Sequence, residues 1–174
     1  IGTEEDMAQA IQWYRQSAER GYPRAMNNLG LCYEHGDGVE EDMEQAARYY
    51  QQAADRGYAP ALCNLGVCYE YGQGVPEDKA RAVELYRQAS EVNYPPAMCS
   101  LGLCYETGDG VDSDPEQATA WYLKAAQRGH APAQCNLAVC ILHGYGAERD
   151  PLKAVEWLQK AAEQNFPRAL DILG

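Results

Sequence analysis

Apolar and polar side chains alternate along residues 23–57 in the pattern of two helices separated by a glycine-rich turn. Ala25, Leu29 and Tyr33 are spaced four apart, which places them on one face of a helix. Glycines follow within one turn and predict the end of that helix, because glycine readily adopts the left-handed conformation of a C-terminal cap. Asp42 then predicts the N-cap of a second helix.

The second helix is expected to bury small side chains around one tyrosine. Its predicted inner face consists of Ala46, Tyr50, Ala53, Ala54 and Gly57. Its predicted outer face consists of Gln45, Arg48, Gln52 and Asp55. Small residues opposite large ones would allow the two helices to approach closely as an antiparallel hairpin.

This two-helix pattern recurs every 36 residues along the chain. The most regular row consists of Leu29, Leu65, Leu101, Leu137 and Leu173. A fixed period of this length predicts an all-α solenoid, in which each unit buries its apolar face against its neighbours. The chain divides into a partial repeat at 1–22, complete repeats at 23–58, 59–94, 95–130 and 131–166, and a partial repeat at 167–174.

The chain ends are expected to interrupt the repeat. Gly2 falls in register with Gly38, which places the first residues inside a repeat loop. The partial first repeat then provides a lone second helix at about 4–20, and the last residues fall inside a first helix. We therefore interpret the chain as a fragment of a longer array.

The chain resembles the Sel1-like repeat family, a relative of the tetratricopeptide repeat with a longer loop between its helices. The resemblance lies in the pattern Ala25-x3-Leu29-Gly30-x2-Tyr33-x2-Gly36-x-Gly38-Val39-x2-Asp42, followed by Ala46, Tyr49-Tyr50, Ala53-Ala54 and Gly57. It covers essentially the whole chain. It implies a right-handed α-solenoid that serves as an adaptor or scaffold for protein complexes.

The resemblance also indicates where a partner would bind. In related tetratricopeptide modules, the side of the first helix that faces away from its own hairpin lines a concave groove. On a helical wheel Asn27, Leu31 and Glu34 lie on that side, with Asn28 at its edge. We therefore predict a binding surface made of equivalent residues in successive first helices, and we call it the first-helix surface.

The first-helix surface consists of four rows of residues. It also includes Tyr71, which lies at the end of its helix. The amide row is Asn28, Asn64, Ser100 and Asn136. The apolar row is Leu31, Val67, Leu103 and Val139. The acidic row is Glu34, Glu70 and Glu106, with Leu142 in the last place. The remaining row is Asn27, Cys63, Cys99 and Cys135.

An apolar row between amides and carboxylates suits an extended peptide or a helix of a partner protein, since amides can pair with a peptide backbone. The glutamates favour a partner of basic character. Arg24 and Arg168 are the only Lys or Arg residues on the first helices and lie at opposite ends, which argues against a clamp for a C-terminal carboxylate. The alternative is that the apolar row packs against the adjacent helix and the asparagines pair with neighbouring backbone.

The charge balance narrows the class of partner. With 26 acidic and 14 basic side chains, the net charge is −12. A protein of this sign lacks the clustered cations that bind nucleic acid or an anionic membrane surface. No stretch approaches the roughly 20 apolar residues that span a bilayer. We expect a solvated acidic surface that favours solubility.

Seven cysteines raise the possibilities of disulfides and of zinc, but their spacing favours neither. Two cysteines within one helix are five residues apart, as in Cys63 and Cys68, and their side chains diverge. The cysteine pairs and histidine spacings of structural zinc sites are missing, so no metal site is predicted. We interpret Cys32 and its equivalents as small apolar fillers between helices. Reduced thiols favour the cytoplasm, although the location is otherwise undetermined.

No catalytic motif of a hydrolase or phosphate-binding loop occurs in the sequence, and no cofactor is predicted. We therefore predict a non-enzymatic scaffold. Self-association through the open ends of the array is the alternative within binding functions. A thiol-dependent hydrolase, using Cys135 or Cys140 beside His143, is the alternative from another class. Some cysteine-rich relatives are described as β-lactamase-like, but the serine and lysine of that chemistry are missing here.

The fourth complete repeat departs from the common pattern. Alanine replaces glycine at 138, isoleucine replaces tyrosine at 141, leucine replaces glutamate at 142 and alanine replaces valine at 147. Two interpretations remain open. The repeat is either atypical because it approaches the end of the array, or it is locally specialised.

Overall fold

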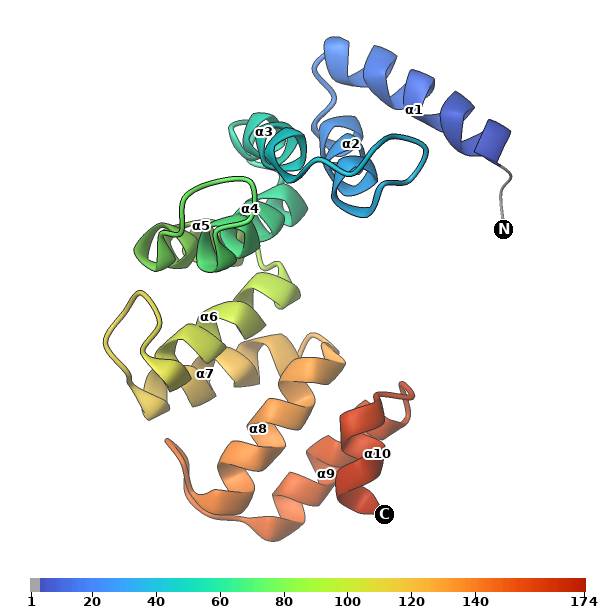
Figure 1. Ribbon diagram of the computed structural model, residues 1–174. Helices are drawn as coiled ribbons and strands as arrows, with labels where there is room; N and C mark the ends of the chain where they lie inside the picture. Colours follow the sequence, from blue (N-terminus) through green and yellow to red (C-terminus); the bar gives the residue numbers. More distant parts are fainter. Residues whose placement is uncertain (1–3) are drawn as a thin grey trace. The chain divides into compact units, whose positions relative to one another are not determined.

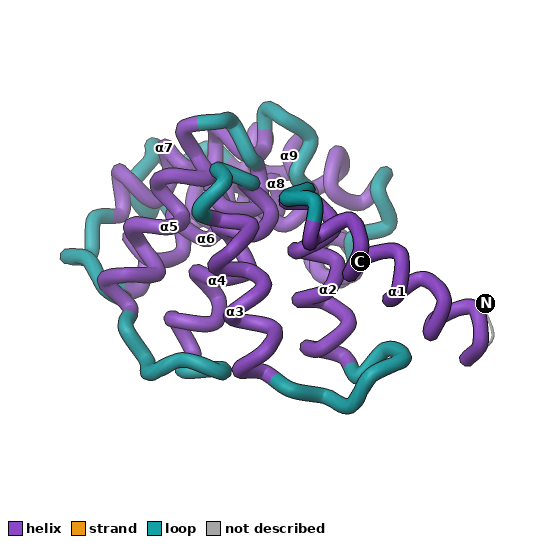
Figure 2. Tube along the Cα trace, turned by 90° about the horizontal axis from the view of Figure 1, so that it is seen from above, coloured by secondary structure: helices purple, strands orange, loops and turns teal. Residues whose placement is uncertain are grey.

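The computed structural model describes residues 4–174, and side chains from Met7 onward. This part of the chain contains ten helices and no strand (Figures 1 and 2). The helices are α1 (Glu4–Glu19), α2 (Pro23–His35), α3 (Met43–Ala54), α4 (Ala59–Tyr71), α5 (Lys79–Glu91), α6 (Pro95–Thr107), α7 (Pro115–Ala126), α8 (Ala131–His143), α9 (Pro151–Ala162) and α10 (Pro167–Leu173). The fold is an all-α solenoid of helix hairpins, as the sequence predicted. The register of Gly2 lies outside the described residues.

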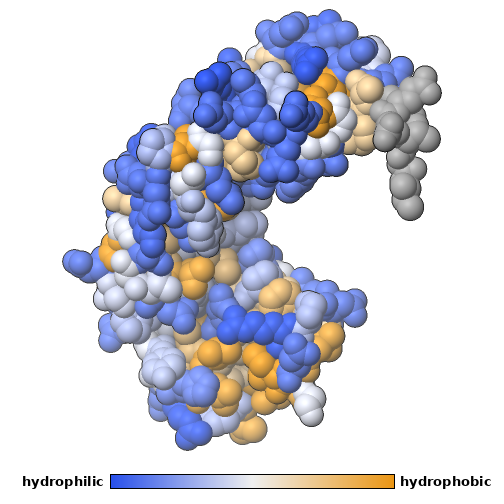
Figure 3. All heavy atoms as spheres, in the orientation of Figure 1, coloured by the Kyte–Doolittle hydropathy of each residue, from blue (hydrophilic) through white to orange (hydrophobic). Residues whose placement is uncertain are grey.

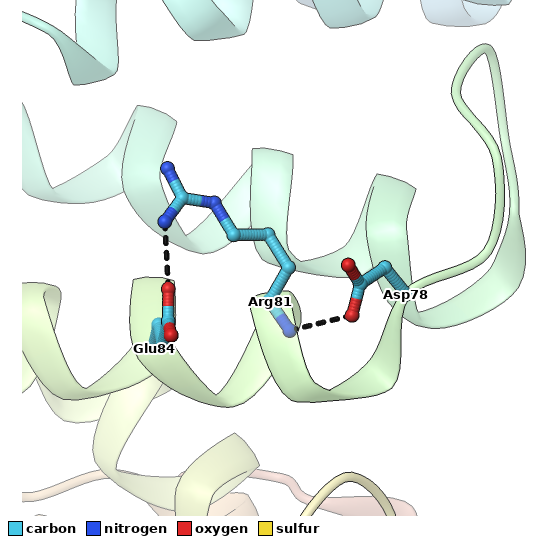
Figure 4. Close-up of polar contacts among 3 residues, drawn as sticks. All are labelled: Asp78, Arg81 and Glu84. Carbon is cyan, nitrogen blue, oxygen red and sulfur yellow. Dashed lines mark hydrogen bonds and ion pairs between the residues drawn. The ribbon is translucent and has the colours of Figure 1, made fainter.

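The ends of the helices follow from local sequence. Each complete first helix ends at a glycine in the left-handed conformation, for example Gly36 with φ 70°. The second helices of the four complete repeats follow an aspartate, and Asp42 accepts a hydrogen bond from the backbone N–H of Gln45, as predicted. In Figure 4 Asp78 accepts in the same way from the N–H of Arg81 at the start of α5.

The described chain forms two compact units, one that extends to residue 89 and one from residue 90 to 174, and the boundary falls in the last turn of α5. In the first unit α1 packs on α2, α2 on α3 and α3 on α4. In the second unit the same succession runs from α6 to α10. Both units bury the leucine row and the inner tyrosines; Leu29 and Leu65 are buried in the first, Leu101 and Leu137 in the second.

Close approach within the hairpins depends on glycine in the first helix. A Cβ atom added to Gly66 would lie 2.5 Å from Cε1 of Tyr86, and one added to Gly102 would lie 2.7 Å from Cδ1 of Tyr122. The tyrosine rings therefore lie directly against the backbone of the first helix. This agrees with the expectation that small residues face large ones.

One residue of the predicted inner face is placed differently. Ala46, Tyr50 and Ala53 are buried as predicted, but Gly57 is exposed and lies beyond the end of α3. Its φ of 71° shows why glycine stands there, because it allows the left-handed turn into the next first helix. The correction is that Gly57 is a turn residue and not a packing residue.

Candidate functional site

The glutamates of the acidic row each accept a hydrogen bond from a tyrosine of their own hairpin. The hydroxyl of Tyr86 donates to Glu70 at 2.6 Å, and that of Tyr122 donates to Glu106 at 2.5 Å. Tyr50 donates to Glu34 in the same way. These carboxylates therefore turn toward the second helix of their hairpin, which corrects the prediction that Glu34 faces the opposite side. The physical reason is that a buried phenol needs an acceptor, and the glutamate supplies it.

The environment of these tyrosines keeps their hydroxyl groups protonated. Burial, followed by the hydrogen bond to Glu34, raises the pKa of Tyr50 far above its ordinary value. Burial and the hydrogen bond to Glu106 raise the pKa of Tyr122 in the same way. Both hydroxyls thus remain protonated donors. One oxygen of each glutamate accepts a hydrogen bond inside the hairpin, so the acidic row has fewer acceptor oxygens available to a partner.

The amide row connects neighbouring repeats. In the first unit Nδ2 of Asn64 donates to Oδ1 of Asn27 at 3.1 Å, across 37 residues of sequence. In the second unit Nδ2 of Asn136 points at Sγ of Cys99 at 3.9 Å, again 37 residues away. The asparagines therefore pair with side chains of the preceding repeat, whereas the sequence offered only neighbouring backbone as the alternative to partner binding.

The predicted surface residues differ in exposure. The buried ones are Asn27, Cys63 and Cys135. The exposed ones are Tyr71, Leu103 and Glu106. The half-buried ones are Asn28, Leu31, Glu34, Asn64, Val67, Glu70, Cys99, Ser100, Asn136, Val139 and Leu142. The three buried side chains cannot line an open surface, and we leave them out of it.

The exposed and half-buried residues fall into two sets, one in each unit. The first unit holds those from Asn28 to Tyr71, and the second unit holds those from Cys99 to Leu142. Leu103, in the apolar row of the second unit, keeps 41% of its surface exposed. Within each unit an apolar side chain therefore lies accessible beside polar side chains, an arrangement that can bind polypeptide.

Arg168 entered the sequence predictions only as an argument against a carboxylate clamp and was not connected with the amide row. Nη1 of Arg168, from α10, donates to Oδ1 of Asn136, from α8, at 2.9 Å. Arg168 and Asn136 are 32 residues apart, so no helical wheel of a single helix brings them together. The signal that could have found it is the repeat register, since Arg168 stands where the three preceding repeats have proline at 60, 96 and 132.

Several of the cysteines lie in environments that disfavour reactivity. All seven are held as thiols, and the row from Cys32 to Cys140 is buried between helices, as predicted. Burial raises the pKa of Cys68 to about 11, and burial also raises the pKa of Cys135 and of Cys140. A thiol that holds its proton is a poor nucleophile, which weighs against the thiol-hydrolase alternative.

Three further properties of the described chain bear on function. Among residues 4–174, no group of three or more histidine, cysteine, aspartate or glutamate side chains is arranged to hold a metal ion. Over the same residues, none of the helices has the length and apolar character needed to cross a membrane. Burial lowers the pKa of His130, which occupies the position of Tyr22, Tyr58 and Tyr94 before a first helix.

Family comparison agrees with the repeat architecture described above. The Sel1 repeat model matches residues 1–22, 23–58, 59–94, 95–130 and 131–166. The chain belongs to the Sel1 repeat family. Proteins of this family generally act as scaffolds for protein interactions and are typically non-catalytic.

Solved structures of Sel1 repeat proteins are similar to this chain. A Sel1 repeat protein from Oxalobacter formigenes is 34% identical, with a TM-score of 0.91, over 95% of this chain and 66% of that protein. The protective antigen c5321 of uropathogenic Escherichia coli, which displays the same fold, is 37% identical, with a TM-score of 0.83, over 88% of this chain and 33% of that protein. The immunity protein Pa5087 from Pseudomonas aeruginosa is 26% identical, with a TM-score of 0.64, over 91% of this chain and 59% of that protein.

The chain thus spans about two thirds and one third of the lengths of the first two of these Sel1 proteins. A comparison with curated protein sequences gave no match.

Proposed function

We propose that this Sel1 chain binds a protein or peptide segment through the accessible residues of the first-helix surface in each unit. The observation that carries the proposal is the 41% exposure of Leu103 in α6, on the surface predicted to receive a partner. Half-buried Ser100 and exposed Glu106 flank it on the same helix. Interfaces that receive an extended segment or a helix combine an apolar centre with a polar rim, and Leu103 with half-buried Val139 of α8 supplies apolar side chains in this unit.

The same surface favours a segment with basic side chains near its glutamates. Glu70 and Glu106 each give one oxygen to a tyrosine and keep acceptor capacity on the carboxylate, since an ionised carboxylate offers about four lone-pair sites. An incoming lysine or arginine would complete that shell with a charge-assisted hydrogen bond. The net charge of −12 would also attract such a segment before contact.

The test uses peptides selected against the wild-type protein from a random library, followed by affinity measurement with fluorescence anisotropy. Leu103→Ser removes the exposed apolar side chain of α6, and Leu123→Ser is the matched control, because Leu123 is 36% exposed on the second helix α7. We expect Leu103→Ser to weaken binding about ten-fold or more, as for a central interface residue. Equal affinities for the two variants would contradict the proposal.

A second candidate function is self-association. Leu170, Ile172 and Leu173 of α10 are 48%, 41% and 39% exposed, and Figure 3 shows hydrophobic residues gathered over α9 and α10. Such a cluster suits packing against another copy of the chain. The test is light scattering after size-exclusion chromatography over a dilution series. The molar mass should rise with concentration for the wild type and stay monomeric for the double variant Leu170→Ser, Ile172→Ser. A wild type that is monomeric throughout removes this candidate.

A further inference from the structure

A pocket in the second unit lies between α7 and α8, beside the loop that leads into α9. Its volume is about 410 Å³, within the range of pockets that bind ligands. Its apolar lining residues are Leu123, Leu137, Ile141, Ala147, Pro151 and Leu152. None of the residues that line it belongs to the first-helix surface, so the pocket is a separate candidate site.

The fourth repeat departs from the common pattern at two of these lining residues. The three preceding repeats have tyrosine at the position of Ile141 and valine at the position of Ala147. The equivalent pocket of the first unit, between α3 and α4, is lined by Tyr69 and Val75 and has a volume of about 270 Å³. Both departures put a smaller side chain in the wall, which agrees with the larger volume of the pocket beside α8.

The interior of the pocket is also less polar than the equivalent place in the first repeat. There the tyrosine of the common pattern, Tyr33, accepts a hydrogen bond from Nη2 of Arg15 at 3.3 Å. The residues at these two positions of the second unit are Ile141 and Leu123, so the hydroxyl and the guanidinium are replaced together. A wall without these polar groups favours an apolar ligand group, since a buried polar group would need a partner.

Hydrogen bonds inside the unit hold the walls of the pocket in place. The hydroxyl of Thr119, in α7, donates to the backbone C=O of Tyr145 in the loop at 2.9 Å. Nε of Arg149, in the same loop, donates to the backbone C=O of Leu142 in α8 at 3.0 Å. The loop is therefore joined to both helices, and little order has to be created when a ligand binds.

The exposure of Leu152 distinguishes a protein segment from a free small molecule as the occupant. Leu152 lines the pocket and is nevertheless 80% exposed. A free molecule that filled the pocket would leave this side chain in water, whereas a segment can place a second apolar residue on it. An aromatic ring fits the pocket itself, because an apolar cavity of about 150 Å³ is enough to hold benzene.

We propose that this pocket binds the aromatic side chain of a protein segment, whose neighbouring apolar residue covers Leu152. The ring supplies from outside the aromatic group that the fourth repeat lacks at Ile141. Phenylalanine suits the site better than tyrosine, because a phenol buried beside Ile141 and Leu123 would find no hydrogen-bond partner in those two side chains.

The experiment titrates the protein with acetyl-GFLG-amide and follows the methyl signals of Ile141 and Ala147 by ¹H–¹³C NMR. The ring current of a bound phenylalanine should shift both signals. We expect this peptide to bind about ten-fold more tightly than acetyl-GALG-amide, which lacks the ring. Benzyl alcohol, which offers the ring without a segment, should bind more weakly than the phenylalanine peptide because it leaves Leu152 uncovered.

Variants test the pocket and its edge separately. Ile141→Tyr combined with Ala147→Val restores the residues of the preceding repeats and should abolish the preference for phenylalanine, read from the methyl signals of Leu123; circular dichroism checks its fold. Leu152→Ser should remove the advantage of the peptide over benzyl alcohol. Val92→Tyr, at a 62% exposed residue outside the pocket lining, is the matched control and should bind like the wild type.

Equal affinities of the phenylalanine and alanine peptides would overturn the inference, and so would a phenylalanine preference that survives in Ile141→Tyr with Ala147→Val. Methyl signals that do not shift at millimolar peptide overturn it as well. Benzyl alcohol that binds as tightly as the peptide would show a site for free aromatic molecules and not for a segment.

The first-helix surface is tested by different measurements, so the two proposals can fail separately. A library peptide that loses affinity in Leu103→Ser and keeps it in Leu123→Ser binds the first-helix surface. One that loses affinity only in Leu123→Ser binds the pocket, because Leu123 lines it.

Discussion

The repeats at 95–130 and 131–166 lie in the same unit but use different residues where their first and second helices pack together. The first combines Gly102, Tyr122 and Glu106: the ring lies against the glycine backbone and the hydroxyl donates to the carboxylate at 2.5 Å. The second has Ala138, Leu158 and Leu142 at the equivalent places. Leu158 and Ala138 are both buried, so the core remains filled.

The difference shows that these three positions change together for a physical reason. A leucine is shorter than a tyrosine, which leaves room for the methyl group of an alanine in the facing helix. A leucine also has no hydroxyl, and the glutamate that accepts from it is no longer required. The departures of the fourth repeat at 138 and 142 are thus explained by Leu158, a substitution that sequence reading had not connected with them.

The largest expected effect on stability comes from removing the buried tyrosine ring of the repeat at 95–130. Tyr122→Ala removes a fully buried ring and leaves a cavity against Gly102, which we expect to lower the free energy of unfolding by about 3–5 kcal/mol. Urea unfolding followed by circular dichroism measures it. Tyr145→Ala, at a tyrosine that is 63% exposed, is the control and should change the stability by less than about 0.5 kcal/mol.

Transplanting the common residues into the fourth repeat sharpens the comparison. Leu158→Tyr alone should clash with Ala138 and cost about 1–3 kcal/mol in the free energy of unfolding. Adding Ala138→Gly and Leu142→Glu should recover most of that loss, because the ring then has its glycine and its acceptor. The same urea measurement decides it. Losses that simply add across the three substitutions would show that the positions are not coupled.

Stability at alkaline pH should depend on the repeat at 95–130 and not on the repeat at 131–166, because only the first has a buried tyrosine at this position. Burial and then the hydrogen bond to Glu106 hold the pKa of Tyr122 above its ordinary value of 10, so the folded state keeps a proton that the unfolded state releases. Its stabilisation is complete below pH 10 and declines above it, by about 1.4 kcal/mol per pH unit.

The measurement is urea unfolding between about pH 9 and pH 11.5. Tyr50 and Cys68 also lower the stability as the pH rises, and they do so equally in every variant. Tyr122→Phe should make the decline above pH 10 less steep. Leu158→Met, at the equivalent position of the next repeat, should leave the slope unchanged because neither side chain titrates. A slope that is the same in Tyr122→Phe and in the wild type would contradict the pKa shift.

The smallest expected difference is in the reactivity of two cysteines that occupy equivalent positions in the two repeats. Cys99 is half-buried, whereas Cys135 is fully buried and burial raises its pKa. Iodoacetamide at neutral pH should therefore modify Cys99 before Cys135, which peptide mass spectrometry after timed quenching can follow. Rapid modification of Cys135 would instead revive the thiol-enzyme alternative.

Much of the fold could be predicted because its determinants are local. The caps at Asp42 and Gly36, and the burial of Ala46 and Tyr50, follow from turn chemistry and helical spacing within a few residues. The candidate site was less predictable. A helical wheel gives the direction of a Cβ atom but not the partner that a long side chain reaches, and Glu34 turned to the tyrosine of its own hairpin.

The sequence by itself determined the repeat period, the helices, their ends and the family, since each depends on contacts within a turn or between identical neighbours. Only the tertiary structure decided which surface residues remain accessible. The contacts that decided it join residues 16 to 37 apart: Glu106 with Tyr122, Asn64 with Asn27, and Arg168 with Asn136. Competition among such distant groups for hydrogen bonds has no signature in the spacing along one helix.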